Sequence, residues 1–436
     1  MAETMTTLAP ERWAFFAHAY NFGDTSRAIE VALSMKATGA IVKFFHRGGT
    51  YVDRIVSAGL EPTLLLPEIS DGQNAILMDM DQHRAPVGTP LPYTVEQLVA
   101  MVESELAALR EFEPDGVYCG LNLSCMISVP HARWPMVTLV PTALCPAFFR
   151  AELASFPDAM DTQLLRHLVP KWVKRKIINR IMLGDVAKKS ALAFNQVREK
   201  YGLPPIFNFT SLVRGDLTLL PDLPELSGLA ADALPPGYAY SGPLFARIDL
   251  PVPAEAHAVF ARPGTKIYCA MGSSVPPELL KRVIAILRSV PEFNVVCATT
   301  HLVAPSELGP ASDRFFATRF LPAHSVNPLA DIAVTHGGQG TVQTAVWSGT
   351  PVVGIAMQWE QQANLDGLVR VGAGLRLPLY GVNEHSLVAA IRQAAEPSYL
   401  ERMSKLQSMV RASDGAREAV RHMRALIGRS ESLRTK

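Results

Sequence analysis

The sequence predicts an α/β protein with two domains, each built on a parallel sheet. Short apolar runs alternate with helical stretches from residue 13 onward, and the same alternation restarts near residue 266. Such alternation is typical of parallel sheets that are covered by helices on both faces. The chain has 436 residues, more than one core usually holds, and a proline-rich stretch over residues 221–264 separates the two series.

The first half opens with an apolar strand and an amphipathic helix. Residues 13–18 (WAFFAH) fit a buried strand, a polar loop follows at 19–24, and residues 25–38 carry apolar side chains at helical spacing. Further strands are expected at 40–45, 63–66, 116–119 and 136–140, and further helices at 51–58 and 123–129. Residues 68–95 are rich in Asp, Gly, Pro and Met without periodicity, so we expect a mobile loop there.

Residues 164–192 are helical in pattern and basic. Cationic and large apolar residues are interleaved in this stretch: Lys171, Lys174, Arg175, Lys176, Arg180, Lys188 and Lys189 with Trp172, Ile177, Ile178, Ile181 and Met182. We favour the solvated face of an amphipathic helix, and the alternative is contact with a membrane surface that gives access to a lipid-like molecule.

The second half repeats the alternation after the proline-rich stretch. Strands are expected at 266–270, 294–299, 315–317, 331–335 and 352–355, and helices at 277–287, 340–348, 397–412 and 415–427. We therefore expect an N-terminal domain over 1–240, a linker over 241–264, a C-terminal domain over 265–412 and a final helical segment over 413–436.

The most informative segment joins the strand at 331–335 to the helix at 340–348. Glycines between a buried strand and a helix start let the backbone approach an anion, and the free amides of the helix then hold it. The following strand leads to Glu360, Gln361 and Asn364, polar groups that can bind hydroxyls beside a phosphate. An anion site next to hydroxyl-binding groups indicates a nucleotide-sugar site.

These residues resemble the donor-binding motif of the UDP-glycosyltransferase family (family 1), and most closely its bacterial small-molecule and antibiotic-type members. The motif H-G-G-x-G-T, then G-x-P, then D/E-Q-x-x-N appears at 336–341, 349–351 and 360–364. Weaker matches lie at 22–40, 195–205, 271–273 and 320–322. The resemblance implies the GT-B fold, in which two Rossmann-like parallel-sheet domains face each other across a cleft and the last helix returns to the first domain.

The resemblance also implies an activity, inverting transfer of a hexose-type sugar from a nucleoside-diphosphate sugar to an acceptor hydroxyl. The implied donor-binding residues are Ser273, Phe320, Leu321, His336, Gly338, Gln339, Gly340, Thr341, Glu360, Gln361 and Asn364. The Gly340 and Thr341 amides, the Thr341 hydroxyl and the His336 side chain would contact the phosphates, and Ser273 would approach from a neighbouring strand. The alternative for His336 is a turn histidine that is satisfied by backbone.

The sugar and base contacts have structural alternatives as well. Glu360 and Gln361 would bind sugar hydroxyls, or else cap a helix that starts near Gln362. Asn364 is equally a helix-start residue, and Phe320 either stacks on the base or fills core.

The catalytic base is where this chain departs from the family pattern. Family members place a histidine after the glycine of the first loop and an aspartate near the fourth strand, whereas this chain has Asp24 and Gly120. Asp24 is therefore a candidate base, although an aspartate equally fits the N-cap of a helix beginning at Thr25. His18, at the end of the first strand, is the reserve base.

The remaining expectations concern partners and location. A net charge of +1 with 19% charged residues gives no reason to expect nucleic-acid binding. No cluster of metal-ligand spacing appears, so we expect no metal and no cofactor beyond a UDP- or dTDP-linked sugar. The acceptor is expected to be small and partly apolar, with Phe148, Phe149, Phe156 and Trp172 available to bind it. We expect a cytoplasmic protein, because no signal core or membrane span is apparent. We expect it to be a monomer or a homodimer.

Two rival functions remain open. Loss of the usual histidine and aspartate motivates a catalytically altered partner protein that binds nucleotide, although the intact donor motif argues against it. A nucleotide-sugar epimerase or hydrolase shares the expected fold.

Overall fold

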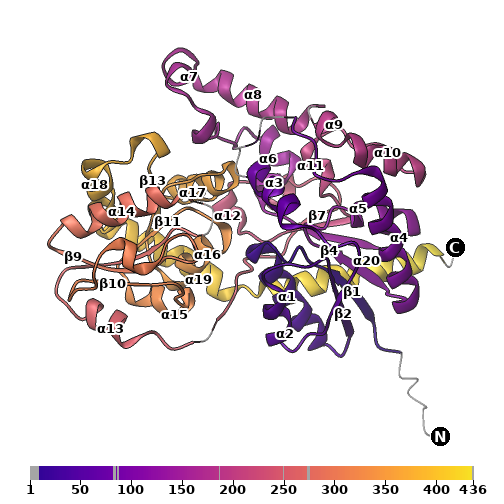
Figure 1. The fold of residues 1–436 in the computed structure, drawn as a ribbon, viewed down its shortest axis with the longest axis horizontal. Coiled ribbons are helices and arrows are strands. Elements are labelled where there is room, and N and C mark those ends of the chain that lie inside the picture. The colour runs from indigo at the N-terminus through magenta and orange to yellow at the C-terminus, as the bar shows by residue number, and fades with distance from the viewer. Residues whose placement is uncertain are drawn as a thin grey trace, which may run out of the picture.

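The computed structural model describes residues 9–81, 85, 88–185, 187–248, 250–272 and 275–434 (Figure 1). It contains two sheets, one of seven strands in the order β3-β2-β1-β4-β5-β6-β7 and one of six in the order β10-β9-β8-β11-β12-β13. Neighbouring strands pair in parallel in both sheets. The predicted fold class, two parallel-sheet α/β domains, is confirmed.

The first domain contains the elements up to β7. They are β1 (Arg12–Phe16), α1 (Phe22–Lys36), β2 (Ile41–His46), α2 (Val52–Ser57), β3 (Pro62–Leu64), α3 (Asp71–Asp81), α4 (Val95–Phe112), β4 (Gly116–Cys119), α5 (Cys125–Ala132), β5 (Met136–Leu139), α6 (Pro146–Arg150), α7 (Gln163–Leu168), α8 (Lys171–Leu183), α9 (Ala187–Ser190), α10 (Leu192–Lys200), α11 (Phe209–Leu212), β6 (Leu217–Leu220), α12 (Pro224–Ser227) and β7 (Tyr238–Tyr240).

The second domain and the closing helices follow. They are α13 (Ala254–Phe260), β8 (Thr265–Ala270), α14 (Pro277–Ser289), β9 (Phe293–Ala298), β10 (Phe315–Thr318), α15 (Ala323–Val326), β11 (Ile332–Thr335), α16 (Gln339–Ser348), β12 (Val352–Gly354), α17 (Trp359–Val371), β13 (Gly374–Arg376), α18 (Glu384–Ala394), α19 (Pro397–Ala412) and α20 (Gly415–Arg434).

Strand β1 shows how each sheet buries both of its faces. Trp13 and Phe15 pack into the cluster that holds the buried side of α1, whereas Ala14 and Phe16 pack into the cluster under α4. Successive side chains of a strand point to opposite faces, so an unbroken apolar run fits a strand with helices on both sides.

The last helix covers the first domain rather than the second. Ala419, Val420 and Met423 of α20 are buried in the same cluster as Trp13, and Figure 1 shows α20 running along the first domain. The chain therefore crosses between the domains twice, once after β7 and once before α20.

Two segments differ from their sequence-based descriptions. Residues 71–81, inside the predicted loop over 68–95, form the helix α3, which the Gln73 amide ties to Pro92 O and to Gln97 of α4. Residues 254–260, inside the predicted linker, form α13, whose Phe260 packs on the second sheet. Both helices are held by contacts with distant residues, which local periodicity does not report.

Candidate active site

The carboxyl ends of the central strands of both sheets meet at one cavity. The strand order changes direction between β1 and β4 in the first sheet and between β8 and β11 in the second. At such a point the connections after the two neighbouring strands run to opposite faces of the sheet. A crevice therefore opens beyond the carboxyl ends of these strands. Segments after all four strands, at Asn21, Leu121, Gly272 and His336, line a cavity of about 410 Å³ between the domains.

The glycine turn after β11 has the predicted strand-to-helix form. Gly338 precedes the first residue of α16 and brings no capping side chain, which leaves the first-turn amides of this ten-residue helix to a ligand. Gly338, Gly340 and Thr341 all line the cavity. The helix thus directs its positive dipole end into the crevice.

His336 is wedged between two glycines. A Cβ at Gly272 would lie 2.4 Å from the imidazole Cε1, and one at Gly338 would lie 2.6 Å from Nε2. Only glycine leaves the ring this space, and Gly272 also has a φ of +68°. Burial lowers the pKa of His336 to about 4, so the imidazole is neutral at physiological pH.

The free energy of unfolding is expected to fall as the pH drops from about 6.5 toward 4, in part because of His336. The folded-state pKa lies below the ordinary value of 6.5, so folding favours the neutral ring. The contribution is fully present above pH 6.5 and is lost as the pH falls through this window. Chemical denaturation at several pH values should show a smaller loss for His336→Asn than for the unmodified protein, and equal losses would contradict the assignment.

The polar residues at the start of α17 divide into a cavity-facing pair and a supporting residue. Glu360 and Gln361 line the cavity, whereas the Asn364 amide donates to Gly337 O at 2.9 Å and to Glu360 Oε1 at 2.7 Å. Asn364 thereby joins the glycine turn to Glu360. The Gln361 Oε1 atom accepts from Met357 N at 3.0 Å, and α17 begins at Trp359, so Gln361 serves the helix start as well.

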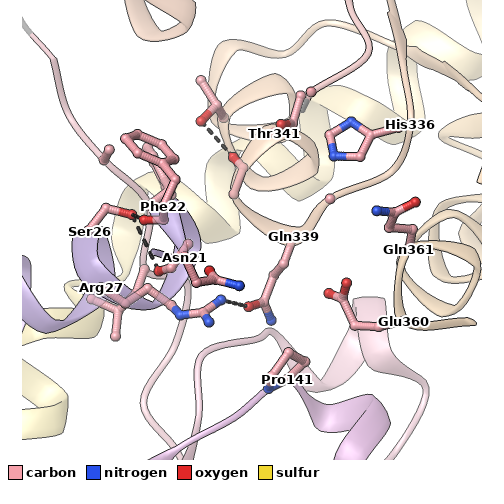
Figure 2. Close-up of a pocket in the computed structure, with 18 of the residues that line it drawn as sticks. Asn21, Phe22, Ser26, Arg27, Pro141, His336, Gln339, Thr341, Glu360 and Gln361 are labelled. Atoms are coloured by element: carbon pink, nitrogen blue, oxygen red, sulfur yellow. Dashed lines mark hydrogen bonds between the residues drawn. The ribbon is translucent and has the colours of Figure 1, made fainter. Parts of the chain in front are cut away.

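The other predicted donor residues also differ in their surroundings. Phe320 is 43% exposed and Leu321 is buried, and both line the cavity, so the core-filling alternative for Phe320 is wrong. Gln339 lines the cavity too, but its side chain accepts a hydrogen bond from Arg27 across the cleft (Figure 2) and donates one to Asp222. Ser273 lies outside the described residues.

A second, apolar cavity of about 300 Å³ adjoins the first and is lined by residues of the N-terminal half together with Trp359 of α17. Its walls include Leu77 and Met78 of α3 and Ile178 and Met182 of α8. The aromatic residues expected to bind an acceptor do not line this cavity, because Phe148 and Phe149 are core residues beneath α8 and Trp172 is 61% exposed.

Asp24 is fully buried and lines neither cavity. The N-cap alternative is wrong, because α1 begins at Phe22 and the cap is Asn21, whose Oδ1 accepts from Asp24 N at 2.9 Å. The Asp24 carboxylate instead accepts from His18 N at 2.9 Å and Leu121 N at 3.2 Å. It therefore ties together the loops that follow β1 and β4.

The joint replacement of the family's histidine and aspartate has a steric explanation. A Cβ at Gly120 would lie 2.4 Å from Asp24 Oδ2, so the absence of a side chain at position 120 makes room for the Asp24 carboxylate. Burial raises the pKa of Asp24, opposed by the charge of Arg27 and by the backbone donors.

His18 reaches the apolar cavity that Asp24 does not. The ring is 9% exposed and lines this cavity, and its backbone is bound to the Asp24 carboxylate. Burial lowers the pKa of His18, and the negative charge of Asp24 opposes that shift. A neutral histidine beside a buried carboxylate can take up a proton and be stabilised as the imidazolium.

Asn21 and Arg27 are cavity residues that the sequence analysis missed. Asn21 lines both cavities, and its Oδ1 caps α1. Arg27 lies on the buried side of α1. A cation at a buried helix position was the one signal in the sequence that pointed to a functional role. In the sequence Arg27 is only a polar exception on an apolar helix face. Its role is not apparent there because its hydrogen-bond partner, Gln339, is 312 residues away.

Comparison with known proteins agrees with this architecture. Residues 296–426 match the family model "Erythromycin biosynthesis protein CIII-like, C-terminal domain". The chain is 27% identical over 309 residues to a PGL/p-HBAD biosynthesis rhamnosyltransferase of Mycobacterium bovis, an alignment that covers 70% of this chain and 66% of that protein.

Two solved structures have the same fold over nearly the whole chain. The kitacinnamycin glycotransferase superposes with a TM-score of 0.70 at 20% identity, covering 96% of this chain and 100% of the other. Glycosyltransferase VinC in complex with dTDP gives a TM-score of 0.65 at 17% identity, with coverage of 96% and 100%.

Fold and homology therefore define a glycosyltransferase-like protein of the GT-B class, as the motif resemblance predicts. Within that class, residues 296–426 of the second domain are similar to the erythromycin biosynthesis protein CIII-like C-terminal domain.

Proposed function

We propose that the protein is an inverting, metal-independent glycosyltransferase. It would move a hexose-type sugar from a UDP- or dTDP-linked donor to a hydroxyl of a small, partly apolar acceptor, without a further cofactor. The observation that carries this proposal is the junction of the two cavities. The anion-binding helix end and Glu360 line one cavity, His18 lines the other, and both share Asn21, Leu121 and Trp359.

The reaction follows from this arrangement. His18 would take the proton of the acceptor hydroxyl while the acceptor oxygen bonds to the anomeric carbon from the side of the apolar cavity. The bond from that carbon to the diphosphate breaks on the opposite side, and its electron pair stays on the leaving phosphate oxygen. The amides of Gly340 and Thr341 would stabilise that charge. Attack and departure on opposite faces invert the anomeric centre.

The names of related proteins suggest which donor to test first. The mycobacterial relative is a rhamnosyltransferase, and a structural neighbour was solved in complex with dTDP. We therefore infer that a dTDP-linked deoxyhexose such as rhamnose is the first donor to try, followed by UDP-linked hexoses. Location in the cytoplasm and a monomeric or dimeric state stay predictions.

The experiment measures diphosphate release with and without an acceptor. The protein is incubated with dTDP- and UDP-sugars and with a panel of apolar phenols and aliphatic alcohols, and thermal shift first identifies which nucleotides bind. Acceptor-dependent release of nucleoside diphosphate supports the proposal. Release without any acceptor would favour a hydrolase, and nucleotide binding without turnover across the panel would favour a partner protein.

The α7–α8 region supports a second element of the proposal, peripheral contact with an anionic membrane. Leu164, Leu168 and Trp172 are 68%, 69% and 61% exposed. Residues 163–192 carry eight Lys and Arg against one acidic residue, and Figure 1 shows α7 and α8 at the edge of the molecule. The inner side of α8 walls the apolar cavity, so a lipid-like acceptor would have a short path from the membrane. No helix within the described ranges is long and apolar enough to span a bilayer.

Binding to vesicles is expected to require both anionic lipid and this surface. The protein should sediment with vesicles containing phosphatidylglycerol but less with pure phosphatidylcholine, and added salt should weaken the binding. Leu168→Ser combined with Trp172→Ala should lower the bound fraction several-fold, because apolar side chains and cations act together at the interface. Leu400→Ser, an exposed leucine on α19, is the matched control. Equal binding of all three proteins would refute the membrane contact.

A further inference from the structure

Arg27 is a buried cation at the wall of the cleft cavity. Its side chain extends from α1 in the first domain, is 8% exposed and lines the cavity together with Gly340 and Thr341 of the second domain. Among the described residues that line this cavity, Arg27 is the only lysine or arginine. Its charge therefore faces the place where the donor phosphates are expected.

The guanidinium is positioned by a neutral partner. Its Nη1 donates to Gln339 Oε1 at 2.6 Å, and Gln339 is the first residue of α16 (Figure 2). The Gln339 amide in turn donates to Asp222 Oδ1 at 2.8 Å, which fixes the side chain that holds Arg27. The Arg27 Nε atom is buried without a hydrogen-bond partner in the described part of the chain.

This arrangement leaves a positive charge that the protein does not neutralise by direct hydrogen bonding. Asp24, three residues earlier on α1, interacts with this cation through space, but its carboxylate accepts its hydrogen bonds from the His18 and Leu121 amides. A buried charge is costly unless hydrogen bonds to an opposite charge compensate it, so the Arg27 guanidinium favours an anionic ligand in this cavity. The nearby His336 is neutral and brings no charge to that anion.

We propose that Arg27 binds the β-phosphate of the nucleoside-diphosphate leaving group and stabilises the negative charge that develops as the sugar departs. This inference rests on the proposed function and adds a catalytic residue to it. The bond between the anomeric carbon and the β-phosphate oxygen breaks with its electron pair on the oxygen, and the guanidinium offers paired N–H donors to that group. The cation comes from the first domain and the amides of Gly340 and Thr341 come from the second, so both domains would contribute to leaving-group stabilisation.

The alternative is that Arg27 only bridges the domains through Gln339. The two roles are separated by comparing nucleoside diphosphate with nucleoside monophosphate, measured by calorimetry with dTDP, dTMP, UDP and UMP. The proteins compared are the unmodified enzyme, Arg27→Met, Arg27→Lys and Gln339→Met. Gln339→Met removes the bridge but keeps the cation, and circular dichroism checks that each variant is folded.

Arg27→Met is expected to lower diphosphate affinity by about 10- to 100-fold and to leave monophosphate affinity nearly unchanged. Arg27→Lys should restore part of the diphosphate preference, and Gln339→Met should lose less of that preference than Arg27→Met, because the cation remains. Equal losses for both nucleotides in Arg27→Met, matched by Gln339→Met, would overturn the inference and leave Arg27 as a bridge. Failure of the unmodified protein to bind any of the four nucleotides would instead overturn the proposed function.

Discussion

Replacement of His18 by glutamine is expected to lower turnover by about 100- to 10,000-fold while nucleotide affinity stays unchanged. His18 lines the apolar cavity but not the donor cavity, so its removal takes away the base without disturbing the phosphate contacts. The measurement is the single-turnover rate of sugar transfer, with dTDP affinity determined on the same preparation.

Asp24→Asn is the matched variant in this experiment. Its amide oxygen can still accept from the His18 and Leu121 amides, so the loops should keep their positions. The amide has nearly the same size as the carboxylate, so the melting temperature should stay close to that of the unmodified protein. Turnover should nevertheless fall, because the imidazolium at His18 loses its neighbouring charge. Full activity in His18→Gln together with loss of activity in Asp24→Asn would assign the base to Asp24 instead.

His336→Ala is expected to weaken nucleoside-diphosphate binding by about 100-fold. The imidazole fills the space between Gly272 and Gly338, and its removal deprives the turn of both a polar contact and its internal support. Calorimetry with dTDP and UDP measures the loss, and the melting temperature of the variant reports on the fold. His385→Ala, an exposed histidine on α18, provides the control.

Unchanged affinity in His336→Ala would contradict the assignment of the glycine turn to the phosphates. The phosphate contacts assigned to Gly340 and Thr341 would then be in doubt as well, because both residues line the same cavity next to the turn. If His336→Ala loses both affinity and melting temperature, the loss of affinity could come from a disturbed fold. His336→Asn is then the second variant, because it keeps a polar side chain between Gly272 and Gly338. Restored stability without restored affinity in that variant would support direct contact with the ligand.

The donor side of the cleft was predictable from the sequence because its parts are nearly contiguous. The buried run of β11, the turn at His336 and the start of α16 follow one another, so strand period, glycine geometry and helix dipole are all local properties. The same holds for Glu360 and Gln361 at the start of α17. The order of strands and helices along the chain was enough to predict that these residues lie at the cleft.

The acceptor side was less predictable because its groups come from separate segments. The sequence predicts that Asp24 is a cap or a base, whereas in the structure its carboxylate accepts a hydrogen bond from the Leu121 amide, 97 residues away. The sequence predicts a loop in place of helix α3 because four of its apolar residues, 75–78, are consecutive rather than at helical spacing, and the contact of Gln73 with α4 holds the helix. The apolar cavity combines α3 and α8, which no local pattern connects.

The sequence by itself determined the two parallel sheets, the strand-to-helix glycine turn and the class of ligand that such a turn binds. Those features follow from side-chain periodicity and backbone freedom within a few residues. Only the tertiary structure decided that His18 rather than Asp24 faces a cavity, and that Arg27 meets Gln339 across 312 residues. The physical reason is that burial and pairing of a charge depend on which distant segments the packed domains bring together.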